Sequence, residues 1–146
     1  MSKKTHSGYQ YIITLIDEDS RHATIKFLKK KSETTRAIQN YIAWYHNTTN
    51  QSIKVFRDDK GGEYTSKELY ESFKSLGITY QETHKATPHE NGLAERYNRT
   101  LLDASRTLLA KLPDDLKYTL SGEALAYSNH TKNNIPHSTT KKIPQH

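Results

Sequence analysis

The order of apolar patterns along the chain is the strongest constraint on its fold. Residues 9–16 are rich in β-branched and aromatic side chains, and residues 23–27 alternate apolar with polar, as a half-buried strand does. The polar segment 17–21 between them favours a turn, so the two segments together predict a hairpin. Short apolar runs at 53–56 and 78–81 predict two further strands.

Helical spacing of apolar residues separates these strands. The first helix is predicted after the basic residues 29–31, with Ser32 as its N-cap. Its apolar face consists of Ile38, Tyr41, Ile42 and Tyr45. A second helix is predicted from Thr65, which has capping-box spacing with Glu68, to Gly77, a residue type that commonly ends helices.

Two more helices are predicted in the C-terminal half. Leu93, Tyr97, Leu101, Ala104 and Leu108 form the stripe of a long amphipathic helix ending near Lys111. Residues 82–91 before it have the composition of a mobile loop. The last helix is predicted from Asp114 to about Tyr127. We expect one domain over residues 1–131 and, because residues 132–146 offer little to bury, an extended or disordered tail.

Composition narrows the partners that the chain can have. Lys and Arg outnumber Asp and Glu by 22 to 16, and the net charge of +6 favours a polyanion such as nucleic acid. The absence of cysteine excludes disulfides and thiolate zinc sites. No apolar run approaches the roughly 18 residues of a membrane span or resembles a signal peptide, so we expect the cytoplasm and nucleus and no membrane. Only 33 % of residues are hydrophobic, which is lean for a stable core.

Two carboxylates occupy positions that suit metal binding. Asp59 follows an apolar strand, and Glu95 lies in the first turns of the long helix. A strand end and a helix packed across the same sheet can bring two carboxylates onto hard divalent cations. The alternative is that Asp59 and Glu95 are both solvated surface residues.

Three segments of the chain resemble a known family. Leu-Ile-Asp-Glu-Asp-Ser-Arg at 15–21, Phe-Arg-Asp-Asp-Lys-Gly-Gly-Glu-Tyr-Thr-Ser at 56–66 and Pro-His-Glu-Asn-Gly-Leu-Ala-Glu-Arg-Tyr-Asn-Arg-Thr-Leu at 88–101 are similar to blocks of integrase catalytic cores from copia-type LTR retrotransposons. Thirty-five residues lie between Asp59 and Glu95, which is the spacing of the last two acidic ligands in that family.

The resemblance implies both a fold and a reaction. The fold would be α/β and RNase H-like, with a mixed five-stranded sheet flanked by helices. Asp59 and Glu95 would be the second and third ligands of Mg²⁺ or Mn²⁺. The intact family enzyme would process the 3′ ends of element DNA and join them to target DNA, and intact members oligomerise.

The same resemblance implies that one ligand is missing. The family's first catalytic Asp lies on the first, central strand, whereas no acidic residue precedes Asp17 in this sequence. Asp17 aligns beyond the second strand and does not take that role. We therefore expect an N-terminally truncated core that lacks the first strand, folds poorly alone and is catalytically inactive.

Four residues near the two carboxylates are candidates for nucleic-acid binding: Lys60, Asn91, Arg96 and Arg99. Two of them have an alternative role, because Lys60 can be solvated and Arg99 can pair with Glu95 one turn away. Arg96 lies beside Glu95, and Asn91 lies on or beside the loop before the helix, where the resembled family engages DNA ends. Two other functions also stay open for the whole chain. It can be a nucleic-acid-binding module without catalysis, or a non-functional remnant of a decayed element.

Overall fold

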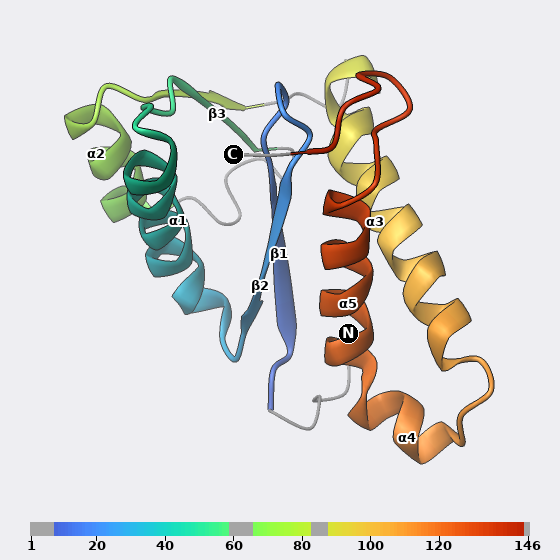
Figure 1. The fold of residues 1–146 in the computed structure, drawn as a ribbon. Coiled ribbons are helices and arrows are strands. Elements are labelled where there is room, and N and C mark those ends of the chain that lie inside the picture. Colours follow the sequence, from blue (N-terminus) through green and yellow to red (C-terminus); the bar gives the residue numbers. More distant parts are fainter. Residues whose placement is uncertain (1–7, 59–65, 83–87, 145–146) are drawn as a thin grey trace. The chain divides into compact units, whose positions relative to one another are not determined.

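The computed structural model describes residues 8–58, 66–82 and 88–144, and the side chains of all of these except residues 88–91. The chain forms two compact units, which Figure 1 shows as ribbons. Unit 1 comprises the described residues up to Lys30 and those from Ala94 onward, and unit 2 comprises the described residues between Lys31 and Leu93. Within the described residues, no helix has the length and apolar character that crossing a membrane requires.

Unit 1 begins with the hairpin that the sequence predicts. Strand β1 (Tyr11–Ile16) pairs antiparallel with β2 (Ala23–Leu28), in a register that sets Tyr11 opposite Leu28 and Ile16 opposite Ala23. Asp17 closes the turn, because its carboxylate accepts hydrogen bonds from the Asp19 N–H and the Ser20 hydroxyl, both at 3.0 Å. This is the local Asx-type bonding that makes Asp a turn former.

Three helices complete unit 1. They are α3 (Pro88–Leu109), whose residues from Ala94 onward belong to this unit, α4 (Asp114–Thr119) and α5 (Ser121–Asn133). The core consists of the buried residues Ala23, Tyr97, Leu101 and Leu125, against which Ile12, Ile16, Ile25 and Phe27 of the hairpin pack. One face of the hairpin is therefore buried by α3 and α5.

Unit 2 contains a strand–helix–strand crossover. Strands β3 (Val55–Asp58) and β4 (Thr79–Glu82) pair in parallel, and α2 (Lys67–Ser75) connects them, as parallel pairing requires. Helix α1 (Thr34–Thr49) contacts α2 through a 2.8 Å hydrogen bond from the Gln39 side chain to the Ser72 hydroxyl. Phe73 is 1 % exposed and lies between the rings of Phe56 and Tyr80, with centroids 4.9 and 6.0 Å away.

The α/β class is therefore confirmed, with antiparallel pairing in one unit and parallel pairing in the other. Within the described residues, strands pair only inside their own unit.

Two helix starts differ from the prediction. Ser32 is not the N-cap of α1, because residues 31–33 form a 3₁₀ turn and the Thr34 hydroxyl donates to the Lys31 carbonyl at 2.7 Å. The N-cap of α2 is Ser66, whose hydroxyl accepts from the Leu69 N–H at 3.2 Å, while Thr65 lies outside the described residues. Both helices begin one or two residues later than the sequence predicts. For α2 the neighbouring hydroxyl residues Thr65 and Ser66 offer equivalent capping signals, whereas Glu33, the N-cap of α1, makes no side-chain cap bond.

The C-terminal helices also differ from the prediction. Helix α3 begins at Pro88, so residues 88–91 are helical rather than part of a loop, and proline is well tolerated at a first helical position. The prediction of the buried face of α3 is wrong in the second half of the helix, since Ser105 is buried whereas Leu108 is 50 % exposed. The last predicted helix is two helices that meet at Leu120, and the second continues to Asn133.

The end of α2 is the clearest agreement between sequence and structure. Gly77 adopts φ +69°, its N–H donates to the Lys74 carbonyl at 3.3 Å, and the Ile78 N–H donates to the Phe73 carbonyl at 2.8 Å. These two bonds are those of a Schellman cap, which needs a left-handed residue at this position.

Replacing Gly77 by alanine is expected to lower the free energy of unfolding by about 1–2 kcal/mol, the cost that L-residues meet in the left-handed region. An added Cβ would meet no atom within 4 Å, so backbone strain alone would cause the loss. Urea denaturation measures it, with the exposed Lys74→Ala change as a control that should stay within about 0.5 kcal/mol. Equal stability of the two variants would contradict the assignment of the cap.

Candidate functional site

Helix α3 presents Glu95, Arg96 and Arg99 on its exposed side. The Glu95 carboxylate forms no hydrogen bond or ion pair with any residue that the structure describes. In particular Arg99, one turn further along, does not pair with it, so this alternative for Arg99 is not realised. The Glu95 carboxylate is therefore accessible to solvent on a regular helix, and its oxygens are available as ligands.

On the opposite side of this turn of α3, contacts with α5 fix the position of Tyr97. Tyr97 is buried, and its hydroxyl donates a 2.6 Å hydrogen bond to the Asn129 side-chain oxygen. The Lys132 ammonium lies 5.5 Å from the centroid of the Tyr97 ring, within cation–π range. Burial raises the pKa of Tyr97 to about 12, so the phenol stays a hydrogen-bond donor throughout the physiological range.

The hairpin contacts Asn98, the residue that follows Tyr97. The Thr14 hydroxyl of β1 donates a 2.8 Å hydrogen bond to the side-chain oxygen of Asn98, which lies one turn after Glu95. Asn129 also donates to the Ala23 carbonyl at 3.1 Å and thereby joins β2 to the Tyr97 hydroxyl. The helix turn that carries Glu95 is thus tied to both strands of the hairpin and to α5.

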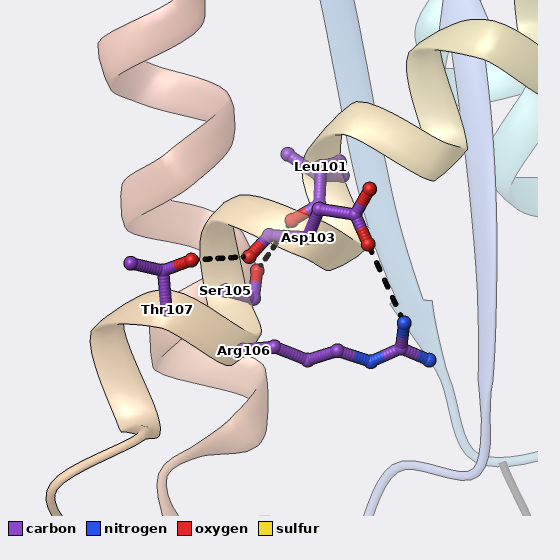
Figure 2. A network of polar contacts seen from close by, with 5 residues as sticks. All are labelled: Leu101, Asp103, Ser105, Arg106 and Thr107. Carbon is purple, nitrogen blue, oxygen red and sulfur yellow. Dashed lines mark hydrogen bonds and ion pairs between the residues drawn. The ribbon is translucent and has the colours of Figure 1, made fainter.

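Further along α3, the polar contacts drawn in Figure 2 join residues of this helix to one another. The Ser105 hydroxyl donates to the Leu101 carbonyl at 2.7 Å and the Thr107 hydroxyl donates to the Asp103 carbonyl at 2.9 Å. Ser105 also lies 3.3 Å from the Ser128 hydroxyl of α5, which explains why a small polar residue is buried there. The Arg106–Asp103 pair at 3.4 Å is exposed, so it adds little stability.

The second predicted carboxylate cannot be placed beside the first. Asp59 and Lys60 lie outside the described residues, and for Asn91 only the helical backbone is described. Asp58, the last residue of β3, accepts a hydrogen bond from the Tyr80 hydroxyl at 3.5 Å. Among the described residues, no group of three or more His, Asp or Glu side chains is arranged to hold a metal ion. The pairing of Asp59 with Glu95 stays a prediction.

Sequence reasoning did not single out the asparagines that tie the elements of unit 1 together. Asn133 lies one turn after Asn129 on α5, donates to the Ala23 carbonyl at 2.8 Å and accepts from the Ala23 N–H at 3.0 Å. The signal that could have identified them is the spacing of two amides at i and i+4, which places both on one helix face. Asp17 has a structural role in the hairpin turn, where its carboxylate accepts two hydrogen bonds.

The Tyr97→Phe change is expected to lower the free energy of unfolding by about 0.5–1.5 kcal/mol, since it removes one buried hydrogen bond. Because the folded pKa of Tyr97 is raised from 10.0 to about 12, the native chain should also lose stability from this group as pH rises from about 10 to 12. Its stabilising effect is fully present below pH 10. The phenylalanine variant should lack this part of the pH dependence.

Urea denaturation at neutral pH and across the alkaline range measures both effects. Tyr127→Phe is the matched control, because Tyr127 is 61 % exposed on the same helix as Asn129. Indistinguishable unfolding free energies and pH profiles for the two variants would contradict the role given to the Tyr97 hydroxyl.

Comparison with known proteins identifies relatives of nearly the whole chain. It is 36 % identical over 138 residues, 93 % of its length, to the retrovirus-related Pol polyprotein from transposon TNT 1-94 of Nicotiana tabacum. It is 30 % identical over 106 residues, 73 % of its length, to the corresponding polyprotein from transposon RE1 of Arabidopsis thaliana. The chain spans only 10 % and 7 % of these polyproteins. No family model matches the chain.

Three solved structures share the fold of this chain. The catalytic core domain of HTLV-2 integrase, determined in complex with magnesium in a trimeric form, aligns with a TM-score of 0.64 at 17 % identity, covering 92 % of this chain and 84 % of that core. The catalytic core domain of BIV integrase gives 0.61 at 17 % identity, covering 91 % and 81 %. A chain of the simian T-cell lymphotropic virus intasome, solved with the B56 gamma subunit of PP2A, gives 0.64 at 22 % identity, covering 87 % and 44 %.

Proposed function

The chain belongs to the retrovirus-related Pol polyproteins of transposons and has the fold of a retroviral integrase catalytic core, and from this premise we propose that it takes part in DNA integration. Its parent would be a copia-type integrase that processes the 3′ ends of element DNA and joins them to target DNA in the nucleus. The observation that carries the proposal is the 36 % identity to a transposon Pol polyprotein across 93 % of the chain.

Asp59 and Glu95 are the residues that would hold divalent metal. Carboxylate oxygens are the ligands that Mg²⁺ and Mn²⁺ prefer, and Glu95 offers one that is exposed and not engaged by any described residue. When bound, such ions activate an attacking hydroxyl and stabilise the leaving oxygen of a phosphodiester. This chain's contribution would be to hold Glu95 in position through the bonds that anchor Tyr97 and Asn98.

Lys60, Asn91, Arg96 and Arg99 would contact the DNA. Arg96 and Arg99 are exposed on the helix that carries Glu95, so a phosphate backbone lying against the carboxylate would pass within their reach. The net charge of +6 supports a polyanionic substrate. Because related cores are described as a trimer and as part of an intasome, we propose that more than one copy acts on the DNA.

Strand transfer between element-end oligonucleotides and a target duplex in Mg²⁺ tests the proposal. The 146-residue polypeptide has no acidic residue before Asp17, so we expect activity only when an integrase first strand bearing its Asp is added upstream. A control extension carries Asn in place of that Asp. Activity of the unextended polypeptide would contradict the need for a third ligand, and inactivity of the folded, extended protein would contradict the proposed function.

The net positive charge also favours a second candidate, a nucleic-acid-binding module without catalysis. Salt-sensitive DNA binding by an extended protein that never joins strands would select this candidate. Failure to fold or bind DNA, with and without the extension, would instead select a non-functional remnant.

A further inference from the structure

The outer edge of β2 is only partly covered. The Asp17 N–H in the hairpin turn donates to the His22 carbonyl at 2.9 Å, so this carbonyl points toward the β1 side of the hairpin. Because backbone groups alternate in direction along an antiparallel strand, Ala23, Ile25 and Phe27 turn theirs away from β1. Within the described residues, β2 pairs with β1 alone, so it is an edge strand there.

The side chain of Asn133 occupies the first of these outward positions. The Ala23 N–H donates to the Asn133 Oδ1 at 3.0 Å, and the Asn133 Nδ2 donates to the Ala23 carbonyl at 2.8 Å. A residue of a neighbouring antiparallel strand would make the same two bonds. The Asn129 Nδ2 also donates to the Ala23 carbonyl, at 3.1 Å. The carboxamide of Asn133 therefore takes the place of a further strand at Ala23.

Packing of α5 positions both asparagines at this edge. The helix lies along β2, as Figure 1 shows, and Leu125 of α5 is buried in the same cluster as Ala23. Asn129 and Asn133 follow Leu125 by one and two turns on the same face of the helix. Because the core fixes this face against β2, the carboxamides cover the edge at Ala23 whenever unit 1 is folded.

Beyond Ala23, the edge has no strand partner among the described residues. The outward backbone groups of Ile25 and Phe27 form no hydrogen bond with the described part of the chain. Their side chains pack against the core of unit 1, which holds this part of β2 extended. Lys26 lies between them and is exposed. An extended edge with unpaired backbone groups is a template on which a second copy of a chain can pair.

An antiparallel pair between two such edges would either use Ala23 or leave it out. The longest register that uses it pairs Ile25 with Ile25 of the second copy and Phe27 with Ala23 of the second copy. Asn133 prevents this register, because it already bonds both backbone groups of Ala23. The register that uses only the open residues pairs Ile25 with Phe27 of the second copy. It sets Lys26 directly opposite Lys26, and like charges in that position destabilise the pair.

We propose that Asn133 and Lys26 keep the edge of β2 from pairing with a second copy of this chain. The carboxamide of Asn133 excludes the longer register, and the ammonium group of Lys26 disfavours the shorter one. Covering elements and exposed lysines are two means by which sheet edges are protected from such pairing. This inference is independent of the proposed function, because it concerns the protein without DNA or metal.

Sedimentation velocity of the 146-residue chain over a range of protein concentrations tests the proposal, with amide hydrogen exchange as the second measurement. The test variant is Asn133→Ala, which removes the carboxamide from Ala23. Asn134→Ala is the matched control, because Asn134 is the next residue and its Nδ2 donates to the His130 carbonyl of α5 at 2.8 Å. Circular dichroism verifies that each variant is folded.

The Asn133→Ala variant should self-associate at least about tenfold more strongly than the parent, because each backbone hydrogen bond gained raises an association constant by roughly two- to tenfold. As its concentration rises, the amides of Ile25 and Phe27 should become protected from exchange. In the parent and in Asn134→Ala these amides should stay unprotected, whereas the Ala23 amide should be protected. A folded Asn133→Ala variant that associates no more than the control, or without protecting Ile25 and Phe27, would overturn the proposal. An unprotected Ala23 amide in the parent would overturn it as well.

A Lys26→Gln variant tests the second register and leaves the bonds of Asn133 in place. Because Lys26 is exposed, this variant should fold as the parent does even if Asn133→Ala unfolds. Its association constant should rise by roughly two- to fivefold through loss of the like-charge contact, with protection of the Ile25 and Phe27 amides. Lys74→Gln, which removes an exposed charge from α2, is the control. Equal association of these two variants would contradict the role given to Lys26 and, with Asn133→Ala unfolded, the whole proposal.

Discussion

Replacing Glu95 by glutamine is expected to abolish metal-dependent strand transfer in the protein extended with an integrase first strand. Glutamine keeps the size of the side chain but removes the negative charge that attracts a hard divalent cation. Loss of an outer partner of a metal ligand commonly costs about 10–100-fold, so loss of a ligand itself should exceed about 100-fold. The initial rate of joined product in Mg²⁺ measures the effect.

A matched control variant distinguishes the loss of the Glu95 carboxylate from the change of net charge that the substitution also makes. Glu123 is exposed on α5, so Glu123→Gln makes the same change of charge within the same unit. Circular dichroism and urea denaturation should be the same for both variants, because the Glu95 carboxylate has no hydrogen bond or ion pair with a described residue. Strand transfer within about threefold of the parent for Glu95→Gln would remove this residue from the proposed site, since loss of a metal ligand should cost far more.

The largest loss of stability is expected from Phe73→Ala. Phe73 is 1 % exposed and packs against the rings of Phe56 of β3 and Tyr80 of β4, so its removal opens a cavity beside the parallel strands. Phe→Ala changes in cores cost about 3–5 kcal/mol, against total stabilities of about 5–15 kcal/mol. The urea midpoint should fall sharply, and unit 2 should unfold at lower urea concentration than in the parent.

Tyr70→Ala is the control for this prediction. Tyr70 lies on the same helix and contacts the Tyr80 ring edge-on at 5.8 Å, but it is 54 % exposed. Its removal should cost clearly less than that of Phe73, because less apolar area returns to water. Similar midpoints for the two variants would mean that the β3–α2–β4 crossover does not depend on Phe73.

Local sequence signals predicted the elements whose causes are local. The alternation of residues 23–27 and the polar turn before it were sufficient for the hairpin, and Gly77 marked a helix end that needs a left-handed residue. The buried side of α3 was predicted only as far as Leu101. Ser105 is buried because it meets Ser128 across two helices, and a hydropathy pattern contains no information about that partner.

The same distinction between local and long-range causes applies to the residues of the candidate site. The block around Glu95 placed this residue on a helix, and the structure bears this out. Asn129 and Asn133 were missed, because their function depends on Ala23, more than a hundred residues away in the chain. The relation between Asp59 and Glu95 is long-range in the same sense and remains a prediction of the family spacing.

Paramagnetic relaxation by Mn²⁺ tests the central claim most directly. In a ¹⁵N-labelled sample of the extended protein, traces of Mn²⁺ should broaden the amide signals around Asp59 and around Glu95 together. Glu95→Gln should weaken the broadening at both places. Broadening of only one of the two segments, or of neither, would show that these carboxylates do not share a metal ion and would contradict the account.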